Sequence, residues 1–248
     1  MNILQWNCNG IQNKLTELTN FIYQHKIKVA VLQETKLGNK STSPEIPNLT
    51  LIRKDRLSDS GGGLAIYIHK SILFMRLPDL PPDGHTESLC VKIGDTNINN
   101  VYIPPTSSCT SGFKPNISNL LLAGDSLVLG DFNAHDSLWH SNIQDIRGSE
   151  LADTIGNSSY CVLNENFPTR QPSHGQPTSP DITLASTSLI TSTEWKTVTS
   201  LGSDHVPILL KIGTSIHPIK SDFRKFVNFN KADWEKFTNI TEAEFLKL

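Results

Sequence analysis

The chain has 248 residues, with 22 Lys and Arg against 24 Asp and Glu, for a formal net charge of −2. A chain of this length can bury a substantial core in one large domain. The balanced charge excludes a globally basic coat for nucleic acid but leaves room for a local basic groove. The four cysteines are isolated, which argues against a zinc site or a disulfide framework and favours a reducing compartment. Without a visible signal peptide or an apolar run of about 20 residues, we expect a soluble intracellular protein that does not bind membranes.

Hydrophobic periodicity predicts many strands and a few helices along the chain. Helices are expected over 14–25, 118–122 and 147–155, and strands over 3–7, 29–32, 49–53, 64–68, 72–75, 89–93, 98–102, 126–129, 160–163, 182–185, 195–198 and 206–212. Poor periodicity predicts a loop over 104–115, and a composition rich in Pro, Gly, Ser and Thr predicts another over 168–180. Mixed strands with interspersed helices predict a layered α/β protein in which helices cover sheets.

The composition changes after Ile212, where Lys, acidic residues and several aromatic residues become frequent. We therefore predict one domain over 1–213. Residues 214–248 are predicted to form a linker with a short helix around 231–237, leading towards another domain.

The most informative motif is Gly130-Asp-Phe-Asn-Ala-His135, which follows an apolar strand. We expect Gly130 to release the strand into a turn. The two-residue period of a strand would direct Asp131 and Asn133 towards the same cleft. A carboxylate there can accept a proton, and a carboxamide can orient water or phosphate.

Further polar residues stand at predicted strand ends: Asn7, Glu34, Tyr102, Asp181, Asp204 and His205. Such a set suits metal-assisted phosphodiester hydrolysis, because Mg²⁺ is held by carboxylate and other oxygen ligands together with substrate phosphate. In this hypothesis Glu34 is the main metal ligand and Asn7 adds a neutral oxygen. Asp131 activates water and Asn133 positions it.

The remaining predicted roles concern the phosphate. His205 donates to a phosphoryl oxygen, and Asp181 orients it and keeps it protonated. Asp204 acts in the outer metal shell, and Tyr102 offers its hydroxyl to the phosphate. Each of these residues taken alone also fits a structural role, such as a solvated strand-end cap for Glu34 or a buried structural histidine for His205. Gly61-Gly-Gly63 also has a structural interpretation. It lacks the Lys of a phosphate-binding loop, and it predicts a tight bend into a strand.

Taken in order, these motifs resemble the endonuclease/exonuclease/phosphatase superfamily. They are Trp6-Asn7, Gln33-Glu34-Thr35, Val101-Tyr102, Gly130-Asp-Phe-Asn133, Ser179-Pro-Asp181 and Ser203-Asp-His205. The resemblance implies a DNase I-like fold, which is a four-layered α/β sandwich of two packed mixed sheets flanked by helices. It also implies divalent-metal phosphoesterase chemistry with Mg²⁺, for which Mn²⁺ could substitute.

Other blocks are similar to the endonuclease domain of non-LTR (LINE-type, jockey-like) retrotransposons. They include Asn7-Cys-Asn-Gly-Ile11, Gly61-Gly-Gly-Leu-Ala-Ile66, Arg147-Gly-x-x-Leu151 and Phe167-Pro-Thr169. This resemblance implies that double-stranded target DNA is nicked to leave a 3′-hydroxyl, from which a downstream reverse transcriptase domain primes. We expect Asn9, Ser203 and Thr169 to contact the substrate, and the protein to act in the nucleus after synthesis in the cytoplasm.

Two other functions remain open at this point. The first is an abasic-site repair endonuclease or another phosphoesterase of the same superfamily. The repair enzymes carry an aromatic residue and a Leu at the positions of Thr178 and Pro180, which makes efficient abasic-site cleavage unexpected here. The second is a non-catalytic DNA-binding module, for which acidic residues facing phosphates would have little use.

Overall fold

The computed structural model describes residues 1–38, 41–56, 61–198, 201–213 and 233–245. Met1–Pro218 forms one compact unit, and Ile219–Leu248 forms a second. The described strands of the first unit form two six-stranded sheets, called sheet 1 and sheet 2 below. In sheet 1 the order is β11 (Thr193–Thr197), β12 (Ile208–Ile212), β1 (Asn2–Asn7), β2 (Val29–Gln33), β4 (Leu64–His69) and β3 (Leu49–Lys54). In sheet 2 it is β5 (Met75–Arg76), β6 (Glu87–Ile93), β7 (Thr96–Tyr102), β8 (Ser126–Asp131), β10 (Asp181–Ser186) and β9 (Tyr160–Val162).

Both sheets are mixed, with one parallel pair each. Strands β1 and β2 are parallel in sheet 1, and β7 and β8 are parallel in sheet 2. The other neighbouring strands pair antiparallel. Because strand side chains alternate between faces, consecutive residues such as Ile3 and Leu4 join different apolar clusters.

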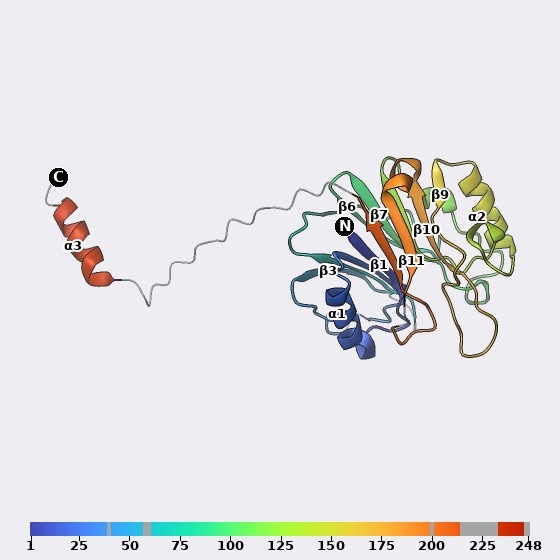
Figure 1. Ribbon diagram of the computed structural model, residues 1–248, viewed down its shortest axis with the longest axis horizontal. Helices are drawn as coiled ribbons and strands as arrows, with labels where there is room; N and C mark the ends of the chain where they lie inside the picture. Colours follow the sequence, from blue (N-terminus) through green and yellow to red (C-terminus); the bar gives the residue numbers. More distant parts are fainter. Residues whose placement is uncertain (39–40, 57–60, 199–200, 214–232, 246–248) are drawn as a thin grey trace. The chain divides into compact units, whose positions relative to one another are not determined.

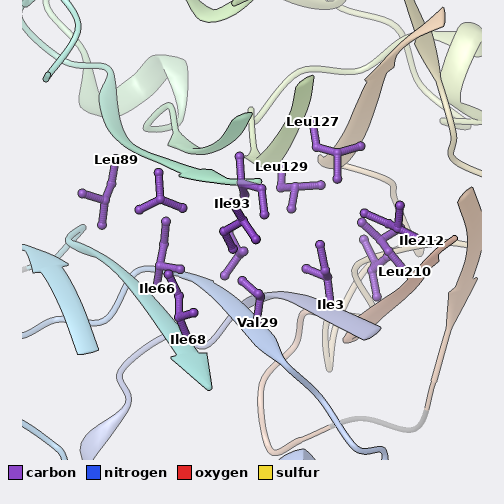
Figure 2. Close-up of a cluster of buried hydrophobic side chains, with 14 of the residues drawn as sticks. Ile3, Val29, Ile66, Ile68, Leu89, Ile93, Leu127, Leu129, Leu210 and Ile212 are labelled. Atoms are coloured by element: carbon purple, nitrogen blue, oxygen red, sulfur yellow. The ribbon is translucent and has the colours of Figure 1, made fainter. Parts of the chain in front are cut away.

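The central core lies between the two sheets. Figure 2 shows Ile3, Val29 and Ile66 of sheet 1 opposite side chains of sheet 2, and the facing residues there include Leu127 and Leu129. All five of these side chains are fully buried. Burying a side chain of this size stabilises the fold by about 1.5–3 kcal/mol, so this interface contributes substantially to stability.

A helix covers the outer face of each sheet. Helix α1 (Leu15–Gln24) buries Leu18 and Phe21 in the apolar cluster that includes the outer-facing residues of sheet 1. Helix α2 (Ile146–Gly156) buries Leu151 and Ile155 against sheet 2. Figure 1 shows α1 and α2 on opposite sides of the paired sheets. This arrangement confirms the predicted four-layered sandwich.

The start of α2 is fixed by a capping residue and a close backbone approach. The Asp145 side chain accepts a hydrogen bond from Gly148 N at 2.6 Å, which satisfies one of the free N–H groups of the first turn. A Cβ on Gly148 would lie 1.9 Å from the carbonyl oxygen of His135, so no other residue fits here without a shift. The predicted Arg147-Gly pair therefore joins α2 to the loop after β8.

The largest differences from the predicted elements concern a strand and a helix. The strand expected over 72–75 is limited to Met75–Arg76, because Ile72 N donates to His69 O in a turn and Leu73 is 72% exposed. The helix expected over 118–122 is a 3-10 turn, Ile117–Leu120, capped by the Asn116 side chain. The 3-10 turns are η1 (Gln12–Lys14), η2 (Thr106–Ser108), η3 (Ile117–Leu120), η4 (Ser137–Trp139) and η5 (Thr187–Ser192).

The predicted linker over 214–248 lies mostly outside the described residues. Within the second unit, α3 spans Trp234–Phe245 and continues beyond the helix expected around 231–237. Its aromatic residues Trp234 and Phe237 are exposed and meet edge to face. In the part of the chain that the structure describes, no helix has the length and apolarity needed to cross a bilayer.

Candidate active site

The strand directions bring the predicted residues to one end of the two sheets. The parallel strands β1 and β2 end there with Asn7 and Gln33 side by side. In sheet 2, Asp131 pairs with Tyr102 on one side and with Asp181 on the other. Because β10 runs antiparallel to β8, it begins where β8 ends. Residues far apart in sequence therefore converge at one edge of the sandwich.

Asn7 links the two sheets at this edge. Its amide nitrogen donates to Glu34 Oε1 at 3.0 Å and to Asp131 Oδ2 at 2.8 Å. Its amide oxygen accepts a hydrogen bond from Asn9 N at 3.1 Å. Asn7 thus presents its nitrogen to the two carboxylates, whereas the sequence interpretation made it an oxygen ligand of a metal. In this structure it fixes the separation between Glu34 and Asp131.

A buried carboxylate–imidazole pair lies beside Asp131. Asp181 Oδ2 is 2.8 Å from His205 Nδ1, and His205 Nε2 is 4.0 Å from Asp131 Oδ2. The Thr169 hydroxyl donates to Asp181 Oδ2 at 2.9 Å and accepts from Asp181 N at 3.1 Å. The imidazole is therefore held by Asp181 and directs its other nitrogen towards Asp131.

This pair and Asp131 have shifted pKa values. Burial and the charge of Asp181 raise the pKa of Asp131 to about 7, although His205 opposes the shift. Burial disfavours the charged form of His205, but the charge and hydrogen bond of Asp181, together with Asp131, outweigh it and raise the pKa of His205 to about 9. At neutral pH His205 can therefore donate from both nitrogens, and Asp131 lies near its own midpoint, where a carboxylate is an effective proton acceptor.

The loop after β8 is an Asx turn. Asn133 N donates to Asp131 Oδ1 at 2.9 Å, and Asn133 has a φ of 44°. Its side chain donates to Ile103 O at 3.0 Å. The expectation that strand periodicity aligns Asp131 with Asn133 is therefore wrong in its reason, because Asn133 lies beyond the strand end.

Gly130 and Arg147 support this turn. Gly130 is inside β8, and a Cβ there would lie 2.0 Å from the carbonyl oxygen of Val101, so close packing of β7 accounts for the glycine better than a turn does. Arg147, which is buried, donates from Nη1 to the carbonyl oxygens of Pro104, Phe132 and Asn133 at 2.8–3.1 Å. The sequence alone indicates no role in the site for Arg147.

The segment carrying Glu34 has an unusual backbone. Glu34 has a φ of 49° and Lys36 a φ of 52°, a region that non-glycine residues rarely adopt and that costs of order 1–3 kcal/mol. Backbone hydrogen bonds from Gly10 N to Glu34 O and from Lys36 N to Gly62 O hold the segment in place. Strain of this kind concentrates at functional sites, so this backbone marks the Glu34 segment as a candidate part of the site.

The other predicted site residues, Asp204, Thr169, Ser203 and Asn9, each have a different set of contacts. Asp204 ion-pairs with Arg170 at 2.8 Å, which outweighs burial and lowers the pKa of Asp204. Thr169 is fully buried against Asp181, and Ser203 donates to Asn7 O at 3.0 Å. Both hydroxyls are engaged within the protein in this structure, and the substrate contacts of Thr169 and Ser203 stay predictions. Asn9 is exposed and accepts a hydrogen bond from Lys36.

Two groups of donor atoms can be considered for a cation. Among the described residues, Asp131, Asp181 and His205 have ligand atoms within 4.8 Å of one another and could hold a metal ion. Asp181 is hydrogen-bonded to His205 Nδ1 and, with Asp131, raises the pKa of His205, so a cation in this group would compete with a proton for Nε2. Glu34 is an oxygen donor with an 18% exposed side chain, and the Lys36 ammonium lies 3.5 Å from its Oε2. The negative charge gathered by Glu34, Asp131 and Asp181 suits a hard divalent cation.

A cleft of about 740 Å³ opens beside Glu34. Glu34 and Tyr102 both line it. Burial and the neighbouring Glu34 charge raise the pKa of the Tyr102 hydroxyl far above its ordinary value, so this hydroxyl stays protonated. The other lining residues include Lys36, Lys54, Arg56, Asp83, His85, Glu87, Pro104, Pro105 and Asn116.

Buried amides join the sheets just behind the site, and the sequence analysis missed them. The Gln5 side chain donates to Gly130 O at 3.3 Å and to Ile182 O at 3.2 Å. The Asn100 side chain donates to Leu32 O at 2.9 Å and to Ala65 O at 3.1 Å, and accepts from Gln33 at 2.7 Å. Polar residues inside otherwise apolar strands were the available signal, because such residues are buried only with partners.

Comparison with known proteins gives three consistent results. Residues 96–209 match the family described as Endonuclease-reverse transcriptase. The chain is 28% identical over 219 residues to the probable RNA-directed DNA polymerase from transposon X-element of Drosophila melanogaster, an alignment that covers 86% of this chain and 24% of that protein. The chain thus spans about a quarter of the length of the curated relatives it matches.

Solved structures with a similar fold include nucleases. The endonuclease domain of TRAS1, a telomere-specific non-LTR retrotransposon, superposes with a TM-score of 0.69 at 20% identity, covering 86% of this chain and 99% of that one. An AP endonuclease from Archaeoglobus fulgidus gives a TM-score of 0.67 at 15% identity, covering 86% of this chain and all of that one. These structures confirm the predicted DNase I-like fold.

Proposed function

We propose that this chain nicks double-stranded target DNA. It carries an endonuclease-reverse transcriptase domain of the DNase I-like fold and is homologous to the RNA-directed DNA polymerases of non-LTR retrotransposons. The reaction is hydrolysis of one phosphodiester bond, in which water attacks phosphorus and the bond to the 3′ oxygen breaks. It leaves a 3′-hydroxyl and a 5′-phosphate. The observation that carries the proposal is the Asn7 amide bonded to both Glu34 and Asp131, with the Asp181–His205 pair beside them.

Each residue has a role that follows from its surroundings. Asp131, with a pKa near 7, accepts the proton of the attacking water, and Asn133 positions that water or the phosphate. His205, kept protonated by Asp181, donates a hydrogen bond to a phosphoryl oxygen as negative charge develops there. The Tyr102 hydroxyl donates to the same phosphate.

A divalent cation, Mg²⁺ or Mn²⁺ in its place, fits the excess of carboxylates. Glu34 would hold it, and the cation would supply positive charge for the phosphate and the departing 3′ oxygen. Asn7 is assigned to orient Glu34 and Asp131, because its amide oxygen is already bonded to Asn9 N. Asp204, ion-paired with Arg170, is placed in the outer surroundings of this site.

Relaxation of a supercoiled plasmid tests the proposal directly. The protein should relax the plasmid with Mg²⁺ and not with EDTA, and the nicked ends should prime DNA synthesis by a polymerase without prior treatment. Asp131→Ala and His205→Ala should each lower the nicking rate by roughly 10²- to 10⁴-fold. A plasmid left intact at high protein concentration, or variants as fast as the natural chain, would contradict the proposal. Tight DNA binding without cleavage would instead favour a DNA-binding module.

In the complete protein, the nick would serve a polymerase. We propose that residues 214–248 connect this domain to a downstream reverse transcriptase, which extends the 3′-hydroxyl at the nuclear target site. The relatives are RNA-directed DNA polymerases several times longer than this chain, which supports that arrangement.

A second candidate function is abasic-site repair, favoured by the fold of the AP endonuclease described above. Against it, Thr178 pairs with Arg170 in a backbone bridge, and Pro180 O accepts from Phe132 N. Neither supplies an aromatic wall for a baseless sugar. Cleavage of matched duplexes with and without one abasic site separates the two functions. A preference above about 100-fold for the abasic duplex, on the order of the gain from a good positioning contact, would favour repair.

A further inference from the structure

A cation–aromatic contact lies in the cleft beside Glu34. The Arg56 guanidinium carbon is 5.5 Å from the centroid of the Tyr102 ring. Arg56 Nε donates to Glu87 Oε1 at 2.5 Å, and Nη2 forms an ion pair with the same carboxylate oxygen. A guanidinium over an aromatic face is attracted by the ring's electron density, and the contact is strongest where water is excluded.

The carboxylate that holds Arg56 is itself fixed from two sides. Glu87 pairs with Tyr102 across β6 and β7, and its Oε2 accepts a hydrogen bond from Gly63 N at 2.7 Å. A Cβ on Gly62 would lie 2.3 Å from Glu87 Oε1, and Gly62 and Gly63 have φ values of 64° and 87°. The glycine run before β4 therefore forms a bend and also packs closely against the Glu87 side chain.

The same glycine run also holds the Glu34 segment. Thr35 N donates to Gly63 O at 3.1 Å, next to the bond from Lys36 N to Gly62 O described above. Tyr102 and Glu34 line the same cleft, and burial together with the Glu34 charge raises the pKa of the Tyr102 hydroxyl. The contacts thus run from the Glu34 segment through the glycines and Glu87 to Arg56 and the Tyr102 ring.

We propose that Arg56, locked by Glu87, is a positioning residue that holds the Tyr102 ring so that its hydroxyl stays between Glu34 and the scissile phosphate. The proposal rests on the proposed nuclease function. The alternative use of Arg56 is a direct contact with the DNA backbone. The structure favours positioning, because Nε and Nη2 both approach one largely buried carboxylate oxygen, and the Glu87 charge offsets that of the guanidinium.

A double-mutant cycle on plasmid nicking tests the coupling. Arg56→Ala should lower kcat about 5- to 30-fold with KM changed less than about threefold, the range expected for a desolvated cation–aromatic contact. In a Tyr102→Phe background the same substitution should cost less than about threefold, because the hydroxyl it positions is gone. Equal losses in the two backgrounds, or a loss confined to KM, would overturn the proposal.

Lys54 and Glu87 provide the matched controls. Lys54 lines the same cleft and pairs with Asp79 at 3.1 Å, so Lys54→Ala removes the same charge without touching Tyr102. Its effect should be the same in both backgrounds. Glu87→Gln should lower kcat as Arg56→Ala does. If Arg56 instead binds DNA directly, Glu87→Gln frees the guanidinium and lowers KM, a result that rejects positioning.

A measurement without DNA keeps this inference separate from the nuclease function. The chain has four tyrosines, so protein labelled with 3-fluorotyrosine gives four ¹⁹F resonances, and Tyr102→Phe identifies the one of interest. Arg56→Ala should shift and broaden that resonance, and Lys54→Ala should leave it in place, with cooperative thermal unfolding showing that each variant is folded. A Tyr102 resonance unmoved by Arg56→Ala would refute positioning even in an active enzyme. Failure of the natural chain to nick DNA would refute the nuclease function alone.

Discussion

Replacing Asp181 by Asn should shift the pH range in which the protein nicks DNA. The substitution keeps the size of the side chain but removes the charge that holds the proton on His205. At pH 7.5 a group with a pKa of about 9 is roughly 97% protonated, and a return to the ordinary value of 6.5 would leave roughly 9%. Loss of protonation alone should therefore slow nicking about tenfold at pH 7.5 and less than about twofold at pH 6.

The orientation of the imidazole adds a second, pH-independent loss. The new amide nitrogen can donate to His205 Nδ1 and so favour the neutral ring with the wrong nitrogen protonated. The rate of plasmid relaxation should be measured from pH 5.5 to 9.5 at saturating Mg²⁺. In the natural chain the rate should fall above about pH 9, and in Asp181→Asn this fall should begin roughly two units lower.

Asp204→Asn is the matched control, because Asp204 contributes the smallest named share of the raised His205 pKa and is mainly paired with Arg170. It should move the alkaline limb far less. The sign of the stability effect is also fixed. His205 has a folded pKa above its unfolded value of 6.5, so its stabilisation is complete below pH 6.5 and is lost as the pH rises through about 9. An alkaline limb in Asp181→Asn at the natural position would refute the assigned role of this pair.

Three further outcomes are expected. Gly130→Ala should lower the free energy of unfolding, measured in urea, by at least about 2 kcal/mol, because its Cβ would lie 2.0 Å from a backbone carbonyl oxygen. Gly156→Ala, which has open space around the Cβ, should change it by less than about 1 kcal/mol. Equal effects of the two substitutions would reject the steric argument. Glu34→Gln should need at least about tenfold more Mg²⁺ for half-maximal nicking, and an unchanged Mg²⁺ titration would remove Glu34 from the cation site. Arg147→Met should lose about 2–4 kcal/mol in the same urea assay, because three backbone carbonyls lose a charged donor, and a loss below about 0.5 kcal/mol would show that water replaces it.

The strands that sequence predicts best are those with long apolar runs. Leu64–His69 could be predicted because every residue up to Ile68 is buried, and such runs leave little choice of structure. Short elements were harder to predict. The 3-10 turn at Ile117–Leu120 depends on one side-chain cap from Asn116, a local competition that periodicity does not detect.

The members of the site could be predicted, but their contacts could not. Asn7, Glu34 and Asp131 stand at strand ends, and strand-end polar residues in a layered α/β protein gather at the sheet edges. Which atom of Asn7 faces the carboxylates depends on the turn at Asn9. Arg56 depends on Glu87, 31 positions away, and Arg147 depends on carbonyl groups of two separate loops. Such long-range partners follow only from the folded arrangement of the two sheets.

The Asn7 link has a consequence for how the molecule tolerates change. Glu34 belongs to one β-layer and Asp131 to the other, so any sliding of the layers would alter the gap between the cation ligand and the proton acceptor. The apolar interface that keeps the layers in register thus also fixes the distance between Glu34 and Asp131. Trimming a methyl group deep in that interface, for example by Ile66→Val, should lower turnover by a larger factor than it changes DNA affinity, although the altered atom never meets the substrate.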